Sequence, residues 1–442
     1  MTANIARITD DLRALPDKSF VKASGRVKRF DGQVLECGGF PVSVGSICGV
    51  STASGQVAMA EVIGFRDGRN MLFLYDLDAR IELGAQVTIL DPGNEIEVGP
   101  EILGRVIDAL GAPLDERGPL KLPDRWPLMG RPLNPVARKA VSRPLDVGVR
   151  VVNGLLTVGS GQRLGIIAGS GVGKSVLLSM MTRFSQADVI IVGLIGERGR
   201  EVGHFVEQVM PGDVRKKVCV VAVPADRSAL LRIKGANRAT AIAEYFRAQG
   251  KEVLLIMDSM TRVAHARREI GLALGEQPTA KGYPPSVVSM IPALIERSGA
   301  GEAGQGAITA FYTVLADGDD VTNDPVVDTA RAILDGHIVL SRRQTQLGIY
   351  PAVDVTASVS RVMSDITPSR HQKAAVRFRR LVSLYLENRD LMLMGGYSPG
   401  QDPELDLAVS LWPKITEYIR QGANEACRFS DSQQDLIRLM GE

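Results

Sequence analysis

Short apolar runs alternate with segments of helical period through the middle of the chain. Each run is rich in Val, Ile and Leu, and a longer segment with apolar residues on one helical face follows it. Strands that alternate with helices in this way predict a mainly parallel sheet covered by helices on both faces. The predicted strands are 163–168, 188–195, 217–223, 252–258 and 307–315.

The chain before this α/β region has a β-type pattern. Residues 20–91 contain short runs of alternating apolar and polar residues, separated by glycines and Asp-Gly turns. This spacing predicts a small all-β domain, a β-barrel. The clearest runs are 25–30, 56–65 and 71–75, and a stretch rich in proline and arginine, 113–144, is predicted to be a linker.

The pattern turns helical beyond about residue 367. Ser430 and Gln433 have the spacing of a capping box at the start of the last predicted helix. These segments predict a C-terminal α-helical domain. Its predicted helices are 371–388, 403–421 and 430–440.

The first residues also have a helical period. Ile5, Ile8, Leu12 and Leu15 lie on one face, and Pro16 ends the segment. Such a helix either packs on its own domain or docks on a partner, and both interpretations remain open.

Composition narrows the functional classes. The chain has 442 residues, too many for one core, and a net charge of only +2, which gives no broad footprint for nucleic acid. Its four cysteines form no CxxC pair and its four histidines have no metal-ligand spacing, so we expect no zinc site or disulfide framework. No apolar run approaches the ~20 residues of a membrane span, and no signal-like segment begins the chain, so we expect a cytoplasmic protein.

A phosphate-binding loop is predicted between the first central strand and the helix that follows it. Glycines there let backbone N–H groups wrap phosphates, and the helix N-terminus adds partial positive charge. Lys174 is expected to reach the β- and γ-phosphates of ATP, and the Ser175 hydroxyl to ligate Mg²⁺. Ala168 stands where the usual motif has glycine. The loop residues are Gly169, Ser170, Gly171, Val172, Gly173, Lys174 and Ser175.

Two carboxylates complete the predicted chemistry. Asp258 ends an apolar strand and is expected to hold Mg²⁺ through its water shell. Glu197 follows the strand 188–195 and is the candidate that orients the attacking water, with Glu201 as the fallback.

Several long motifs in order resemble the rotary-type ATPase family, and within it the flagellar protein-export ATPases most closely. They are AGSGVGKS, IGERGREV, LLIMDSMTR, KGYPPSV, DTARAILDGHIVLSR and GIYPAVDVTASVSRVM. The resemblance covers nearly the whole chain and is strongest from about residue 144 to residue 365.

The resemblance implies an assembly and further site residues. It implies a homohexameric ring in which Arg361 acts as an arginine finger in a neighbouring subunit's site. It also implies that Tyr350 stacks on adenine, that Tyr397 closes the other side of the base, and that Arg198 contacts the γ-phosphate region. The implied domains are 1–19 as a partner-binding segment, 20–97 as the barrel, 98–366 as a RecA-like ATPase domain and 367–442 as the helical domain.

Further partners follow from the same resemblance. A regulatory stator-like protein is expected at the N-terminus, and export substrates with chaperones and membrane export-gate proteins at the C-terminal side. The chain is thereby expected to associate peripherally with an inner-membrane export apparatus, and no nucleic-acid partner is expected.

Four alternatives stay open at this point. The first is the ATPase of a virulence injectisome, which shares the fold and the export role. The others are the catalytic subunit of ATP synthase, an RNA-dependent hexameric translocase and a non-catalytic nucleotide-binding subunit. A glutamate at 197 argues against the last, because a structural subunit is expected to lack the water-orienting carboxylate.

Overall fold

The computed structural model describes residues 23–315 and 324–441, apart from the side chain of Ala280. The predicted helix of the first 15 residues lies outside the described part. The chain divides into two compact units, Met1–Asn94 and Glu95–Glu442.

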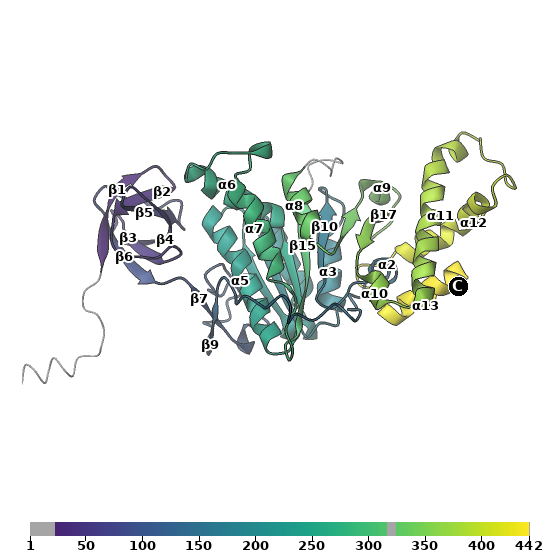
Figure 1. Cartoon of the computed structure of the whole chain (residues 1–442), viewed down its shortest axis with the longest axis horizontal. Coiled ribbons are helices and arrows are strands. Elements are labelled where there is room, and N and C mark those ends of the chain that lie inside the picture. The colour runs from purple at the N-terminus through teal and green to yellow at the C-terminus, as the bar shows by residue number, and fades with distance from the viewer. Residues whose placement is uncertain (1–22, 316–323, 442) are drawn as a thin grey trace, which may run out of the picture. The chain divides into compact units, whose positions relative to one another are not determined.

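The first unit is a closed six-stranded barrel with strand order β1-β2-β5-β4-β3-β6 (Figure 1). Leu35, Val50 and Leu72 are fully buried in the core of the barrel. In β1 and β4, buried residues alternate with exposed or half-buried ones, as the β pattern predicts. The barrel prediction is therefore confirmed. Its strands are β1 Ser24–Phe30, β2 Val34–Gly38, β3 Ile47–Ser51, β4 Val57–Arg66, β5 Arg69–Leu74 and β6 Gln86–Asp91.

The second unit is built on a sheet of nine strands, with main order β17-β16-β10-β15-β13-β11-β12-β8 and β14 paired with β15. Neighbouring strands are parallel from β16 to β8, and β17 and β14 are antiparallel additions. All five predicted strands are present. The strands are β8 Val106–Ile107, β10 Arg163–Ala168, β11 Val189–Ile195, β12 Val218–Val223, β13 Glu252–Asp258, β14 Gly299–Ala300, β15 Ala307–Leu315, β16 Gly336–Leu340 and β17 Val353–Ser360.

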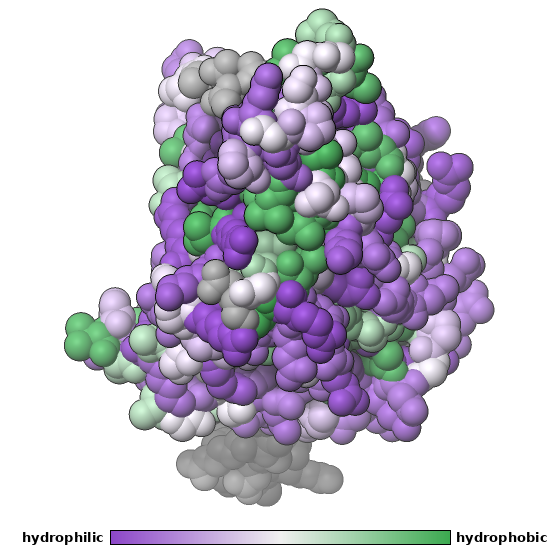
Figure 2. Space-filling view, turned by 90° about the vertical axis from the view of Figure 1, so that its right-hand side faces the viewer, coloured by the Kyte–Doolittle hydropathy of each residue, from purple (hydrophilic) through white to green (hydrophobic). Residues whose placement is uncertain are grey.

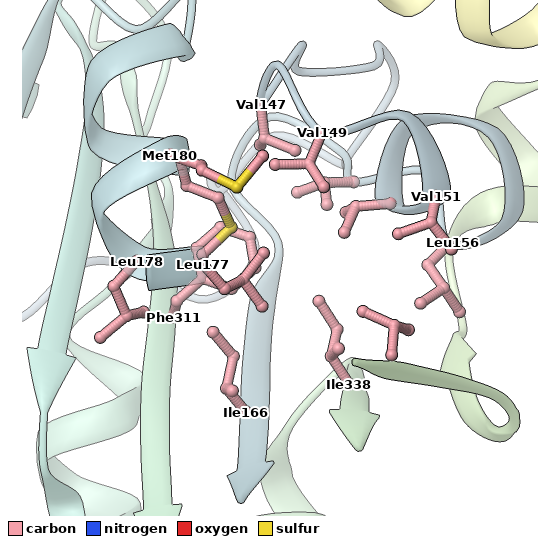
Figure 3. Packing of buried hydrophobic residues seen from close by; sticks show 14 of the residues in the cluster. Val147, Val149, Val151, Leu156, Ile166, Leu177, Leu178, Met180, Phe311 and Ile338 are labelled. Carbon is pink, nitrogen blue, oxygen red and sulfur yellow. The ribbon is translucent and has the colours of Figure 1, made fainter. Parts of the chain in front are cut away.

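Two separate hydrophobic cores fill the two faces of this sheet. Ile166 packs in one core and its neighbour Ile167 in the other, because successive side chains of a strand point to opposite faces. Figure 3 shows Leu177, Leu178 and Met180 lying over Ile166 in the first core. Both faces are therefore covered, which explains why the central strands are apolar throughout.

Helices of the second unit cover these faces (Figure 1). Helices α5, α6 and α7 contribute to the second core, and α2 and α3 to the first. Their bounds are α2 Arg150–Leu155, α3 Lys174–Phe184, α4 Gly199–Val209, α5 Ala229–Ala248, α6 Met260–Ala273, α7 Pro285–Glu296, α8 Pro325–Ile333, α9 Arg342–Gln346 and α10 Met363–Ile366.

The C-terminal helices are α11 Ser369–Leu393, α12 Pro403–Ile419 and α13 Phe429–Met440, which confirms the helical domain. Phe378, Ile415 and Leu436 are buried in the same core as α2 and α3. The helical domain is thus packed on the nucleotide-binding part rather than tethered to it.

The capping box predicted at Ser430 and Gln433 is wrong. Helix α13 begins one residue earlier, and the backbone N–H of Phe429 donates to Asp146 Oδ2 at 2.8 Å. The Gln433 amide instead contacts His371 Nδ1 at 3.0 Å. A carboxylate distant in the sequence therefore supplies the cap that the local pattern suggested.

The linker predicted at 113–144 is also a packed element. Strand β9 Asp124–Pro127 pairs with β7 Glu95–Val98. Trp126 is buried, and its indole N–H donates to Glu244 of α5 at 3.4 Å. None of the helices in the described ranges is both long and apolar enough to cross a membrane.

Candidate nucleotide site

The phosphate-binding loop lies between β10 and α3. It is therefore at the side of the sheet where the carboxyl ends of the parallel strands lie, called here the carboxyl edge; the side where their amino ends lie is called the other edge. Gly171 and Gly173 have φ values of 76° and 84°, in the left-handed region that favours glycine. Val172 between them is 1% exposed and anchors the loop in the core. Helix α3 begins at Lys174, so the loop and the helix N-terminus present backbone N–H groups to the same space.

Lys174 lies between the two predicted carboxylates. Its Nζ is 2.6 Å from Asp258 Oδ1 and 3.2 Å from Glu197 Oε1. The three side chains are 12%, 10% and 5% exposed for Lys174, Glu197 and Asp258. Three charged groups, from the end of β13, the turn after β11 and the first residue of α3, therefore meet in a poorly hydrated cluster.

Turn geometry delivers Glu197 to this cluster. Gly196 directly follows β11 with φ of 75°, and a side chain there would run into Arg262. The N–H of Gly196 donates to Val223 at 2.7 Å, and the carbonyl of Glu197 accepts from Ala225 at 3.0 Å. Glu197 is thus fixed by backbone contacts to the end of β12. Glu201 lies one helical turn further on, in α4, so the geometry favours Glu197 over Glu201.

Burial and charge act in opposite directions on this cluster. Burial alone would lower the pKa of Lys174, but the nearby charges of Asp258 and Glu197 outweigh it and raise the pKa, so the ammonium is retained. Burial raises the pKa of Asp258, against the pull of Lys174 and of the Thr313 hydroxyl. The charged state of the lysine therefore depends on the two nearby carboxylates and not on solvation by water.

A cavity of about 400 Å³ opens beside the cluster. Glu197, Asp258 and the Ser175 residue line it, together with Phe205 and His204 of α4. Ser175 is exposed. The predicted metal-binding residues therefore border one cavity, at a volume typical of ligand sites.

Tyr350 lies against Gly173 of the phosphate-binding loop. A Cβ placed on Gly173 would come within 3.7 Å of the Tyr350 ring, which is about half exposed at 49% for the residue. The carbonyl of Tyr350 accepts from the backbone N–H of Gln421 at 2.9 Å. Residues between α12 and α13 thereby hold the loop that carries Tyr350.

The structure does not bring Tyr397 or Arg198 into the cluster. Tyr397 donates to Asp406 Oδ1 at 2.6 Å within the helical domain, and this hydrogen bond raises the pKa of Tyr397. Arg198 is 78% exposed at the side chain and lies 3.9 Å from Glu201 Oε1. Arg198 is therefore at the rim, where a ligand or another subunit has access to it.

Arg361 lies at the other edge of the sheet. Ser360, the residue before it, pairs with Gly336 at the start of β16, whereas the phosphate-binding loop follows the end of the parallel neighbour β10. Arg361 is exposed, and its backbone N–H donates to the Asp335 carbonyl at 3.0 Å. An arginine on this edge does not face the cluster of its own chain.

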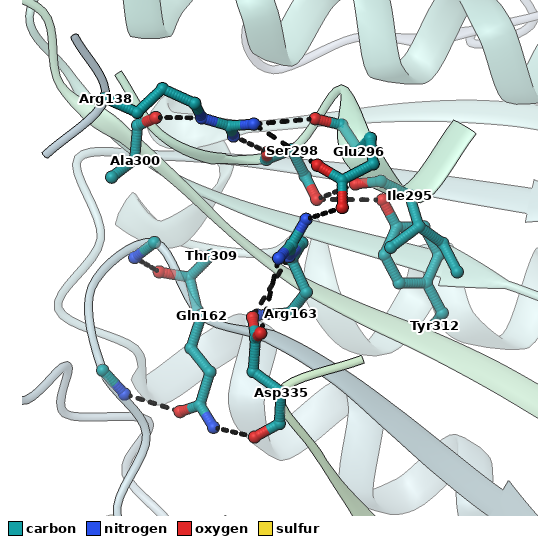
Figure 4. Close-up of polar contacts among 12 residues, drawn as sticks. Arg138, Gln162, Arg163, Ile295, Glu296, Ser298, Ala300, Thr309, Tyr312 and Asp335 are labelled. Carbon is teal, nitrogen blue, oxygen red and sulfur yellow. Dashed lines mark hydrogen bonds and ion pairs between the residues drawn. The ribbon is translucent and has the colours of Figure 1, made fainter. Parts of the chain in front are cut away.

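A polar network holds this edge (Figure 4). Gln162 donates to the Asp335 carbonyl at 2.9 Å and to Ser360 Oγ at 3.0 Å. Arg163 contacts Asp335 Oδ2 at 3.1 Å and Glu296 Oε1 at 2.6 Å. The strand before Arg361 is thereby fixed to the beginning of β10.

Comparison with known proteins identifies the chain. Residues 148–360 match the model of the ATP synthase alpha/beta family, nucleotide-binding domain, and residues 367–438 match the T3SS EscN ATPase C-terminal domain. The chain is 49% identical over 430 residues to the flagellum-specific ATP synthase of Pseudomonas aeruginosa, covering 97% of this chain and 95% of the relative. It is 44% identical to the type 3 secretion system ATPase of Xanthomonas euvesicatoria, covering 94% and 93%.

Solved structures agree with these relatives. The assembled ATPase EscN of the enteropathogenic E. coli type III secretion system superposes with a TM-score of 0.89 at 39% identity, covering 94% of this chain and all of that one. In complex with its central stalk EscO, the same ATPase gives 0.86 with the same coverage and identity. This chain belongs to the family of flagellum-specific ATP synthases and type III secretion ATPases.

Membership in the family makes the chain an ATP-binding, ATP-hydrolysing enzyme. The cluster at the carboxyl edge combines one buried lysine with two carboxylates, side chains of the kinds that phosphoryl transfer uses.

Some residues around the site gave no signal in the sequence. Thr313 donates to Asp258 Oδ1 at 2.6 Å, and Gln162 and Asp335 hold the strand before Arg361. A threonine inside an apolar run is ordinary for a strand, so only the strand register shows its contact. Strands β16 and β17 were likewise not predicted as separate elements.

Proposed function

We propose that six copies of this chain form a ring that hydrolyses Mg·ATP and energises protein export through a flagellar type III secretion apparatus. The single observation that carries the proposal is the division of catalytic groups between two edges of one sheet. Lys174, Glu197 and Asp258 lie at one edge and Arg361 at the other. Such a chain completes a site only when a neighbour presents its own Arg361.

The phosphates are bound by exchange of ion pairs. Entering phosphates compete with Glu197 and Asp258 for Lys174. The Lys174 ammonium then breaks its contacts with the two carboxylates and binds the β- and γ-phosphates. Glu197 then orients water for in-line attack. Ser175 and Asp258 would hold Mg²⁺, Asp258 through the water shell of the ion, and the ion would neutralise phosphate charge. Among the residues that the structure describes, no three His, Cys, Asp or Glu side chains gather to hold a metal, which fits an ion bound largely by substrate phosphates.

Neighbouring subunits complete the chemistry and the base site. Arg361 from the next subunit stabilises charge that develops on the γ-phosphoryl group, and Arg198 at the rim assists. Tyr350 supplies a flat face for adenine beside the loop. Tyr397 closes the other face only if its hydrogen bond to Asp406 is rearranged.

The helical domain supports the export role. Figure 2 looks at the end of the molecule formed by these helices and shows apolar side chains grouped among polar ones. Val376, Leu393 and Met394 are 63%, 74% and 79% exposed. Exposed apolar side chains suit transient contacts with export substrates, chaperones and export-gate proteins.

A stator-like partner is proposed for the segment 1–19. A stalk is proposed for the ring, since EscN binds the stalk EscO. The protein is thereby cytoplasmic and peripheral to the membrane.

The turnover of one variant tests the catalytic part. Glu197→Gln should retain ATP binding and lose roughly 10²- to 10⁴-fold in turnover, the range for a general base. Near-normal turnover of the folded variant would contradict this assignment.

The shared site is tested by mixing variants. Glu197→Gln and Arg361→Ala should each be inactive alone and regain partial activity when mixed, because some interfaces then combine an intact Glu197 with an intact Arg361. Activity of Arg361→Ala equal to wild type would contradict a shared site, and obligate co-purification with a second homologous subunit would contradict a homohexamer.

The injectisome ATPase is the second candidate, since a type 3 secretion system ATPase is 44% identical to this chain. The flagellar role predicts that deletion of the gene abolishes swimming and secretion of flagellar filament protein. Loss of effector secretion with normal swimming would favour the injectisome instead.

A further inference from the structure

Thr313 lies on β15, the strand between the phosphate-binding strand β10 and the Asp258 strand β13. Tyr312 pairs with Met257 in parallel register, so the next residues, Thr313 and Asp258, lie side by side. Thr313 is 0% exposed, and its Oγ1 donates to Asp258 Oδ1 at 2.6 Å.

The direction of this hydrogen bond is fixed by chemistry. A hydroxyl carries one proton, and the other acceptor near Thr313 is the Met257 carbonyl at 3.4 Å. The shorter contact to the carboxylate takes the proton, because charge-assisted hydrogen bonds are short and strong.

Other buried threonines of this domain behave differently. Thr182 and Thr240 donate to backbone carbonyls one helical turn earlier, and Thr309 of β15 accepts from the Gly161 N–H. These contacts satisfy local backbone groups. The hydroxyl of Thr313, by contrast, serves a side chain of the proposed catalytic site.

Lys174 and Thr313 donate to the same carboxylate oxygen of Asp258. Within the described residues, Asp258 Oδ2 receives no hydrogen bond. If Lys174 turns to the phosphates when nucleotide binds, Thr313 is the donor that stays on Oδ1, because it belongs to the sheet.

We propose that Thr313 is a positioning residue, whose hydroxyl holds Oδ1 of Asp258 so that Oδ2 stays available to the water shell of the nucleotide-bound Mg²⁺. The inference rests on the proposed function, because it assigns Asp258 to the metal. Thr313 itself touches neither substrate nor metal.

Thr313→Val tests this with a nearly isosteric side chain. Turnover should fall about 10- to 100-fold, the range for a hydrogen bond to a charged group, and half-maximal rate should need more Mg²⁺. A second readout is the Kd for ADP by titration calorimetry, with Mg²⁺ and with EDTA. The value in EDTA should match wild type, whereas the gain in affinity that Mg²⁺ gives wild type should shrink.

A second pair of variants separates the hydroxyl from packing. Thr313→Ser and Thr313→Ala both remove the methyl group, and only the serine keeps the donor. Serine should restore the Mg²⁺ dependence of ADP binding and most of the turnover, and alanine should not. Equal behaviour of the two variants would overturn the inference, even if Thr313→Val fails to fold.

Thr309→Val is the matched control, because it removes a buried hydroxyl from the same strand away from the cluster. It should keep the wild-type Mg²⁺ dependence. If wild type lacks Mg²⁺-dependent hydrolysis, the proposed function fails. If wild type is active and Thr313→Val keeps its Mg²⁺ dependence, only the role of Thr313 is refuted.

Discussion

The two edges of the central sheet carry ion pairs of opposite character. At the carboxyl edge, a single cation, Lys174, forms ion pairs with two carboxylates beside an open cavity. At the other edge, Arg163 serves Asp335 and Glu296, and Arg138 adds a second cation with hydrogen bonds to backbone carbonyls of Ser298 and Ala300.

The two clusters differ in their charge balance and in the space beside them. The carboxyl edge has an excess negative charge and space beside it, so a ligand that brings phosphates and a metal ion can reorganise its contacts. The other edge is balanced in charge and tied to backbone, so it resists change and holds the strand before Arg361. The same residue types thus form a cluster beside an open cavity at one edge and a fixed network at the other.

The largest effect is expected from breaking the carboxyl edge. Lys174→Met should lower ATP turnover by about 10³-fold, because the phosphates lose their buried charge partner. Steady-state ATPase assays and nucleotide titration measure this.

Lys217→Met is the control for Lys174→Met. Lys217 is also a cation of this domain, but its Nζ donates to the backbone carbonyls of Ser185 and Ala187 at 2.6 and 3.3 Å. Its loss should reduce stability and leave turnover per folded molecule within about twofold of wild type. A similar loss of turnover in both variants would mean that the role of Lys174 is structural.

Breaking the other edge should act on stability. Arg163→Met leaves Asp335 and Glu296 without their shared cation and should lower the unfolding free energy by about 2 to 3 kcal/mol, somewhat under the cost for a fully buried pair because the side chain is 18% exposed. Chemical denaturation measures the change.

Arg143→Met is the matched variant for an exposed pair at the same edge. Arg143 is 62% exposed and lies 2.6 Å from Glu252 Oε1, so its removal should cost less than about 1 kcal/mol. Equal costs for the two arginines would remove the distinction between a fixed network and surface charge.

A smaller effect should separate binding from chemistry at the carboxyl edge. The Gln421 side chain accepts from Arg150 N–H at 2.7 Å and donates to the Gly148 and Glu425 carbonyls at 2.9 and 2.7 Å. Gln421→Ala loosens the segment that holds Tyr350 and should raise KM for ATP about 3- to 10-fold, with kcat little changed. Gln372→Ala, elsewhere in the helical domain, should leave KM unchanged, and an unchanged KM in Gln421→Ala would exclude this support of Tyr350.

The smallest effect concerns pH at the junction of the helical domain. Burial lowers the pKa of His371, whose Nε2 lies 2.6 Å from the Gly154 carbonyl. As the pH falls below about 6.5, His371 binds a proton in the unfolded chain but stays neutral in the folded chain. Stability should therefore fall with a slope of at most about 1.4 kcal/mol per pH unit, and level off below the folded-state pKa.

Denaturation of wild type and His371→Gln between pH 7.5 and about 5 checks this. The difference between the two proteins should change across that window, since the variant lacks the titrating group. His204→Gln, at an exposed position, should follow wild type. Parallel curves for His371→Gln and wild type would contradict the assignment.

The sequence by itself determined five strands of the central sheet and, to within one residue, where they begin and end. Strands that are buried on both faces appear in the sequence as continuous apolar runs, which are easy to recognise. The glycines before Lys174 and the acid at Asp258 predict a phosphate site because they lie at the ends of such runs. The barrel and the C-terminal helices were equally visible, because alternation and helical period are local properties of the chain.

Only the tertiary structure decided contacts between distant segments. The cap of α13 by Asp146, the packing of Trp126 on Glu244 and the hydrogen bond from Thr313 to Asp258 each join residues far apart in the sequence. Local patterns report the period of a helix or strand, whereas these contacts depend on strand register and on which element packs beside which. For the same reason, the placement of Arg361 on the edge opposite Lys174 became visible only once β16 and β17 were paired.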